Sequence, residues 1–234
     1  MSTGRTELML RARFGLLVSL PRNDAQMAKA ALEAGADALK VHINLEHFAS
    51  GLRTGSLEEE AEALAAIVAL GAPVGIVPGA GEKIATREEM LRLARLGIDF
   101  FDLYAQDMPA WMLALEECPM SVMVAFSATH RPWALVESMG LRSRPDLIEA
   151  SIMPHQAYGG RLTAADISEY AEIARRAVQP VIVPTQKAIR PEEAGVLMDA
   201  GVAGLLIGAV VTGTDASGMA RATERFRRAI DSQD

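Results

Sequence analysis

The sequence has little cysteine, few aromatic residues and no run of basic residues. Its one cysteine, Cys118, cannot form an internal disulfide, so a reducing cytoplasm is the simplest expectation. Lysine and arginine total 23 against 30 acidic residues, and this negative balance argues against a nucleic-acid partner. The first long apolar run, Phe14 to Leu20, is too short to cross a membrane, so no membrane partner is expected.

Short apolar runs recur along the 234 residues, and segments with helical spacing separate them. Such alternation is typical of parallel βα units. The expected strands lie within 14–20, 36–44, 72–79, 98–106, 121–128, 146–153, 180–185 and 203–211. The expected helices lie within 24–34, 56–70, 86–97, 163–178, 190–201 and 215–230, with shorter ones within 109–117 and 132–139.

Eight βα units in fewer than 240 residues favour an α/β fold of one kind, a single closed (β/α)₈ TIM barrel with parallel strands. A doubly wound open sheet is the alternative. The chain contains no linker or low-complexity tract, so residues 1–234 are expected to form one domain. The longest loops follow the second, third and sixth strands, at the end of a barrel where active sites are built.

The second strand carries polar residues two positions apart, in the stretch ADALKVHINLEH (36–47). Residues two apart share a face of a strand, so Lys40, His42 and Asn44 lie together, with Leu39 and Val41 on the other face. Helices cover the outside of such a barrel. The polar face is therefore expected to point inward, towards the mouth.

The same alternation directs four more polar side chains inward: Asp102 and Tyr104 from the fourth strand, and Glu149 and Ser151 from the sixth. A carboxylate in apolar surroundings must be paired or have a raised pKa. Lys40 with Asp102 or Glu149 suits acid–base catalysis beside a carbonyl group, with His42 orienting that carbonyl and Asn44, Tyr104 and Ser151 binding the substrate. Two alternatives remain open: a Schiff base on Lys40, and a salt-bridged interior without turnover.

The last two strands suggest a site for a phosphate group. The eighth strand ends in a turn of small residues, Gly208, Ala209 and Val210, whose backbone N–H groups can hold a dianion. The seventh strand ends in VPTQKAIRPEE, which offers Thr185 and Lys187 to the same place. Barrels often bind phosphate between these two loops.

The four histidines, His42, His47, His130 and His155, show no recognised metal-ligand spacing. We therefore predict neither a metal nor another cofactor, although a site assembled in space from His130 or His155 is not excluded by spacing alone. No exposed apolar stripe identifies an interface; a homodimer is an open expectation, because barrels of this size often pair.

The stretches LLVSLPRNDAQMAKAALEAGADALKVHIN and PVIVPTQKAIRPEEAGVLMDAGVAGLLIGAVVTGTD resemble the two ends of N-acylmannosamine-6-phosphate 2-epimerases, a family of ribulose-phosphate-binding barrels. The resemblance implies a (β/α)₈ barrel, a phosphorylated sugar-like ligand and no cofactor.

Individual positions, two of them inside these stretches, depart from that family. Lys40 stands where the family carries an arginine, the third strand lacks its catalytic lysine before Lys83, and Pro184 and Tyr104 replace two acids.

We therefore expect a cofactor-independent isomerase, epimerase or lyase acting on a small phosphorylated sugar or sugar acid. The alternatives are a non-catalytic barrel that binds a phosphorylated metabolite, and a barrel for a ligand without phosphate.

Overall fold

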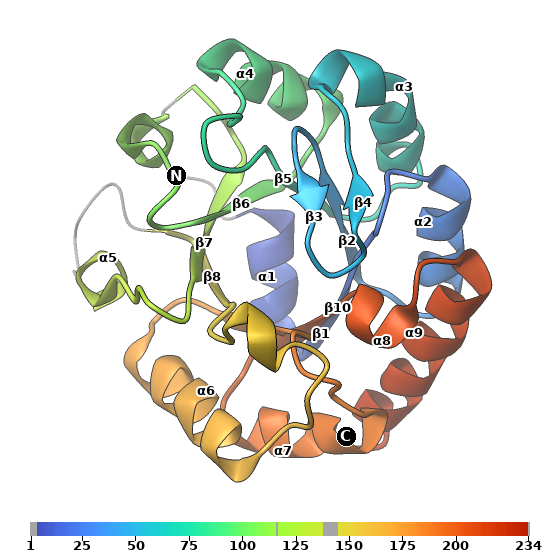
Figure 1. Ribbon diagram of the computed structural model, residues 1–234, viewed down its shortest axis with the longest axis vertical. Coiled ribbons are helices and arrows are strands. Elements are labelled where there is room, and N and C mark those ends of the chain that lie inside the picture. Colours follow the sequence, from blue (N-terminus) through green and yellow to red (C-terminus); the bar gives the residue numbers. More distant parts are fainter. Residues whose placement is uncertain (1–3, 116, 138–144, 234) are drawn as a thin grey trace.

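The structure, a computed structural model, describes residues 4–115, 117–137 and 145–233, whose strands close into a parallel barrel (Figure 1). The order around the barrel is β1 (Gly15–Ser19), β10 (Gly204–Ile207), β9 (Val181–Pro184), β8 (Leu147–Ala150), β7 (Ser121–Phe126), β6 (Phe100–Tyr104), β5 (Val74–Val77) and β2 (Ala38–His42). Each strand lies within the run predicted for it. The predicted (β/α)₈ barrel is confirmed, and the doubly wound sheet is wrong.

Helices form a ring outside the strands (Figure 1). They are α2 (Ala25–Glu33), α3 (Leu57–Val68), α4 (Arg87–Leu96), α5 (Trp133–Glu137), α6 (Ala164–Arg176), α7 (Ala194–Asp199) and α9 (Ala216–Asp231). Ser56, Thr86 and Thr163 begin α3, α4 and α6 with reciprocal capping boxes, which satisfy backbone N–H groups of the first turn. The segment predicted as a helix at 109–117 contains a 3₁₀ helix, Ala110–Ala114. The last two residues of the helix predicted at 132–139 lie outside the described residues.

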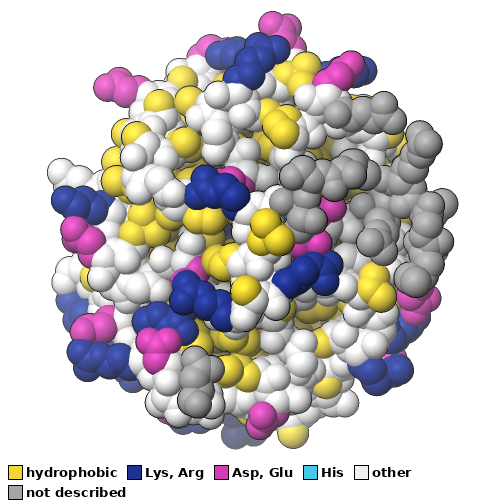
Figure 2. Space-filling view, turned by 180° about the vertical axis from the view of Figure 1, so that it is seen from behind, with side chains coloured by type: hydrophobic (Ala, Val, Ile, Leu, Met, Phe, Trp, Pro, Cys, Tyr) yellow, Lys and Arg dark blue, Asp and Glu magenta, His cyan; other side chains and the backbone are white. Residues whose placement is uncertain are grey.

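Four features were not predicted: α1 (Arg5–Ala12), the short α8 (Ala209–Thr212), a 3₁₀ turn at His155–Ala157, and a hairpin of β3 (Glu46–His47) and β4 (Leu52–Arg53). The hairpin lies in front of the barrel in Figure 1, and α1 lies behind it. Leu10 of α1 packs with Leu17 and Phe100 inside the barrel. The helix therefore closes the end opposite the hairpin, and on that face basic, acidic and apolar side chains are interspersed (Figure 2).

The two faces of each strand belong to different cores. Leu39, Val41 and Ile43 of the second βα unit pack in the shell between strands and helices. Ala38, before Lys40 on the same face, belongs to the separate cluster inside the barrel. The predicted inward direction of Lys40 is confirmed.

Three aspartates fasten neighbouring strands at their N-terminal ends. The backbone N–H of Asp37 donates to the Leu16 carbonyl, and its carboxylate accepts the Leu16 N–H, both at 2.8 Å. Asp99 makes the same pair of bonds to Val74, and Asp146 to Val122. We call these pairs of bonds the aspartate clamps.

Each clamp aspartate lies three residues before a charged inward side chain: Asp37 before Lys40, Asp99 before Asp102, and Asp146 before Glu149. The strand pairing leads from Lys40 through β5 to Phe100, two residues before Asp102. The same step separates Asp102 from Glu149. The three side chains therefore lie in one layer of the barrel, where alternate strands each supply one residue.

Candidate active site

A pocket of about 230 Å³ opens at the C-terminal end of the strands, beneath the β3–β4 hairpin. Its floor is the charged layer of Lys40, Asp102 and Glu149. This is the end of the barrel at which the sequence predicted a site, and barrel enzymes place their chemistry there.

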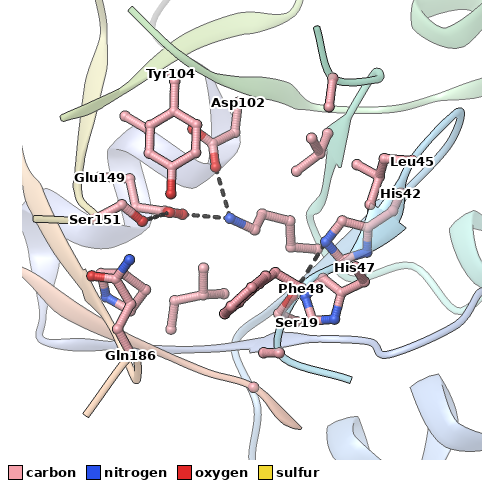
Figure 3. Close-up of a pocket in the computed structure, with 18 of the residues that line it drawn as sticks. Ser19, His42, Leu45, His47, Phe48, Asp102, Tyr104, Glu149, Ser151 and Gln186 are labelled. Carbon is pink, nitrogen blue, oxygen red and sulfur yellow. Dashed lines mark hydrogen bonds and ion pairs between the residues drawn. The ribbon is translucent and has the colours of Figure 1, made fainter. Parts of the chain in front are cut away.

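The carboxyl groups of Asp102 and Glu149 (Figure 3) both form ion pairs with Lys40. Its Nζ is 2.7 Å from Asp102 Oδ2 and donates a second hydrogen bond to Glu149 Oε2. The Ser151 hydroxyl donates to the other Glu149 oxygen at 2.6 Å. All four side chains are buried, so the sequence prediction that these strands bring them together is met in the geometry.

The three ionisable groups of the charged layer have pKa values shifted in different directions. Burial opposes the charge of Lys40, but the Asp102 and Glu149 carboxylates outweigh burial and raise the pKa of the ammonium. Burial and the facing Glu149 raise the pKa of Asp102. Burial also acts to raise the pKa of Glu149, yet the Lys40 ammonium prevails and lowers it. Near neutral pH the stable arrangement is a Lys40–Glu149 ion pair beside a protonated Asp102.

Asp102 has one oxygen without a partner. Its Oδ1 is buried and forms no hydrogen bond with any described residue. Because Oδ2 already accepts from Lys40, Oδ1 is the natural place for the proton of the neutral acid. A raised pKa and an unused polar atom at a pocket floor are together typical of a functional carboxyl group.

Two imidazoles lie on the other side of the pocket. The rings of His42 and His47 have centroids 4.6 Å apart, and His42 Nε2 is 3.5 Å from the Ser19 hydroxyl. Burial, with smaller contributions from His47 and Lys40, lowers the pKa of His42 well below its ordinary value. Burial and then Lys40 lower the pKa of His47 to about 4. Both rings are therefore neutral near pH 7.

Aromatic side chains wall the mouth. Phe48, in the hairpin, stacks on His155 with centroids 3.8 Å apart, and Tyr158 meets Phe48 edge-on. The Tyr158 hydroxyl accepts a hydrogen bond of 2.6 Å from Gln186. Tyr104, a predicted substrate-binding residue, also lines the pocket, and burial raises its pKa, which keeps the phenol protonated.

The predicted phosphate residues separate into two groups. Gly208, Ala209, Val210 and Thr185 all line the pocket. The Gly208 N–H, however, already donates to Thr185 Oγ1 at 2.9 Å. Lys187 is not among the lining residues; its Nζ is 3.5 Å from Asp166.

Asn44 also lies away from the pocket lining. It adopts a left-handed backbone conformation (φ 57°) and donates its N–H to Gly55 at 2.7 Å, so its backbone anchors the base of the hairpin. Sequence reasoning gave no role to Phe48 or Tyr158. Their signal was the length of the loops after the second and sixth strands, in which both residues occur.

The described residues were also compared with the requirements of a metal site and of a membrane span. No group of three or more His, Cys, Asp or Glu side chains among them is arranged to hold a metal ion. None of their helices is both long and apolar enough to span a membrane.

Comparison with known proteins shows similarity in structure alone. No protein-family description and no curated protein matches the sequence. Thiamine phosphate pyrophosphorylase from Pyrococcus furiosus superposes with a TM-score of 0.65 at 16% identity, over 96% of this chain and 98% of that one. Phosphoribosyl anthranilate isomerase from Thermus thermophilus gives 0.66 at 17%, over 94% and 100%. KGPDC from Streptococcus mutans, in complex with D-R5P, gives 0.65 at 14%, over 94% and 98%.

The chain shares the barrel fold of these proteins. At such low identity the likeness establishes the architecture and assigns no reaction.

Proposed function

We propose that the chain is a cofactor-independent isomerase, epimerase or lyase that acts on a small phosphorylated sugar or sugar acid through Lys40, Asp102 and Glu149. The observation that carries this proposal is the buried ammonium between two carboxyl groups of unequal acidity at the floor of a pocket. Buried ion pairs are often no more stabilising than apolar residues of equal volume. Their concentration at a pocket therefore favours a chemical role.

The layer supplies the groups that enolisation needs. A substrate carbonyl beside Lys40 would receive a hydrogen bond from the ammonium, which stabilises the negative charge that forms on oxygen. A neighbouring base would take the proton from the adjacent carbon, and Asp102 or Glu149 would return or redistribute protons. Because the raised pKa keeps Lys40 protonated, this role suits it better than nucleophilic attack to form a Schiff base.

The phosphate part of the proposal has three supports. The backbone at Ala209 and Val210 borders the pocket, beside the loop after β9. The names of two of the structural neighbours contain a phosphate or phosphoribosyl group, and a third is complexed with D-R5P. The resemblance at both ends of the chain is to epimerases of an acylated amino-sugar phosphate. Lys187, paired with Asp166, is not needed for this arrangement.

The test is exchange of substrate C–H for deuterium in D₂O, followed by NMR over a panel of pentose, hexose and acylated amino-sugar phosphates. Wild-type protein is expected to exchange a proton next to the carbonyl of at least one compound. Lys40→Met is expected to reduce that rate at least 100-fold, because it removes the group that stabilises the enolate. Lys83→Met, which changes an exposed lysine, is the matched control.

Thermal unfolding with the same panel separates the alternative function. A ligand at about 100 times its dissociation constant stabilises a protein by roughly 2.7 kcal/mol. A rise in melting temperature without exchange would favour a non-catalytic barrel that binds a phosphorylated metabolite. Neither effect with any compound would refute the proposed substrate class.

A further inference from the structure

The β3–β4 hairpin brings an imidazole into the pocket beside that of His42. His47 lines the pocket from the hairpin, while His42 lines it from the end of β2. Next to His47, Phe48 stacks on His155 across the mouth at 3.8 Å. This contact ties the hairpin to the opposite side of the barrel and holds the His47 ring over the cavity.

A hydrogen bond inside the hairpin engages one ring nitrogen of His47. The Ser50 hydroxyl is 2.8 Å from His47 Nδ1. Because Ser50 occupies Nδ1, Nε2 is the nitrogen left for the substrate. A ring proton on Nδ1 gives Nε2 the free lone pair of a general base, and this is the tautomer that the inference requires.

The carboxyl groups lie away from the imidazoles in the pocket. In the barrel order, β8 with Glu149 is four strands from β2 with His42, directly across the eight-stranded ring, and β6 with Asp102 is two strands from β2. Figure 3 shows His42, His47 and Ser19 on one side and Asp102, Tyr104, Glu149 and Ser151 on the other. A substrate between them meets a neutral base on one face and a carboxylic acid on the other.

We propose that His47 is a further catalytic residue, the base of a two-sided proton transfer that inverts a carbon centre, with Asp102 as the acid on the opposite face. This inference rests on the proposed function and narrows it to epimerisation. The neutral His42 ring, 4.6 Å away, positions the His47 ring without adding a charge beside it.

The step is balanced in protons and electrons. The substrate C–H bond breaks, its proton forms an N–H bond at His47 Nε2, and the electron pair moves to the carbonyl oxygen beside Lys40. The electron pair then returns to carbon, which takes the proton of Asp102 on the other face as the C=O bond re-forms. The resting state returns when His47, at the mouth, loses its proton to solvent and Asp102 regains one.

The first test is the tautomer of His47 in the wild-type protein, read at pH 7 from the ¹⁵N shifts of its ring, with His47→Gln used to assign the signals. A neutral ring protonated at Nδ1 is the expected result. An imidazolium, or a neutral ring protonated at Nε2, would overturn the inference, because neither form offers the lone pair.

The second test follows the sugar phosphate that exchanges fastest in the deuterium assay. In wild-type protein, the inverted product is expected to contain deuterium at early times. His47→Gln is expected to slow inversion of either epimer at least 100-fold, in line with the contribution of a general base, while the product epimer, whose C–H faces Asp102, still exchanges that hydrogen with retention through the ionised form of Asp102. His130→Gln, the same change at a histidine outside the pocket lining, should match wild type.

The outcomes separate this inference from the proposed function. Inversion in His47→Gln within tenfold of wild type overturns the role of His47 and leaves the function standing. If His47→Gln loses both inversion and the product epimer's exchange with retention, to the same extent and with an unchanged melting temperature, the inference is also overturned, because the effect is then not specific to the His47 face. Absence of exchange in wild type overturns both. If His47→Gln does not fold, His47→Asn replaces it, with the same expected loss of inversion.

Discussion

Replacing Lys40 with methionine should make the stability of the barrel depend strongly on pH. The change removes the ammonium and keeps most of the side-chain volume, so two carboxyl groups remain buried with no cation between them. At a hydrogen-bond separation of about 2.8 Å and an effective dielectric constant of about 20, the attraction between Lys40 and the ionised Glu149 is about 6 kcal/mol. Loss of one partner from such a buried group costs about 3–5 kcal/mol.

The sign of the pH effect follows from the carboxyl groups that remain. Without Lys40, burial and mutual repulsion raise the folded-state pKa of Asp102 and Glu149 above their unfolded values. Groups shifted in this direction stabilise the fold below the unfolded pKa, and that contribution is lost as pH rises through the folded pKa. Lys40→Met should therefore be close to wild type near pH 5 and weakest near pH 8, with a slope of up to about 1.4 kcal/mol per pH unit for each proton.

Urea unfolding from pH 5 to pH 8.5 measures this difference, with Lys40→Met/Glu149→Gln as the control. The double variant should recover much of the loss at pH 8, since one buried charge is removed with its partner. A deficit in Lys40→Met that is equal at pH 5 and pH 8 would refute the reasoning, because it would mean that lost packing, and not unpaired carboxylates, sets the cost.

Two further changes test other parts of the fold. The folded-state pKa of His47, lowered to about 4, lies below its unfolded value. The wild-type protein therefore loses stability as pH falls from about 6.5 towards 4. In urea unfolding, the free energy of unfolding of His47→Gln should fall by about 2 kcal/mol less than that of wild type between pH 7 and pH 4.5. Equal acid losses in the two proteins would contradict this. Gly75→Ala places a methyl group against the Phe100 ring inside the barrel and should destabilise the protein by about 1–3 kcal/mol. Adding Phe100→Leu should restore part of that stability. A Gly75→Ala protein with the wild-type melting temperature would refute the packing argument.

The strands could be predicted because alternation in the sequence is a local property. Lys40, Asp102 and Glu149 each interrupt an apolar strand, and a strand fixes which neighbours share a face. Closure of the barrel then brings them together, so the sequence was sufficient for the charged layer. The helix predicted at 109–117 formed only a 3₁₀ turn, Ala110–Ala114, where periodicity over nine residues was too short to decide.

The mouth could not be predicted in the same way. The contact between Phe48 and His155 joins two loops that are distant in sequence, and neither loop has a periodic pattern. Lys187 was placed at the phosphate site from its position after the seventh strand, whereas its flexible side chain turns to Asp166. Strand periodicity fixes direction for inward residues, but a long side chain in a loop takes its partner from the tertiary structure.

The aspartate clamps mark a motif that repeats around the barrel. The motif is an aspartate, two apolar residues and an ionisable residue. It begins at Asp37, Asp99 and Asp146, in the strand pairs β1–β2, β5–β6 and β7–β8. The pair β9–β10 has Ala203 and Leu206 at the two positions and keeps only the backbone bond from Ala203 to Val181. Three quarters of the ring thus each contribute one ionisable side chain and the fourth contributes none. With Asp102 protonated, the remaining ammonium and carboxylate come from different quarters, so the interior becomes neutral only once the ring has closed.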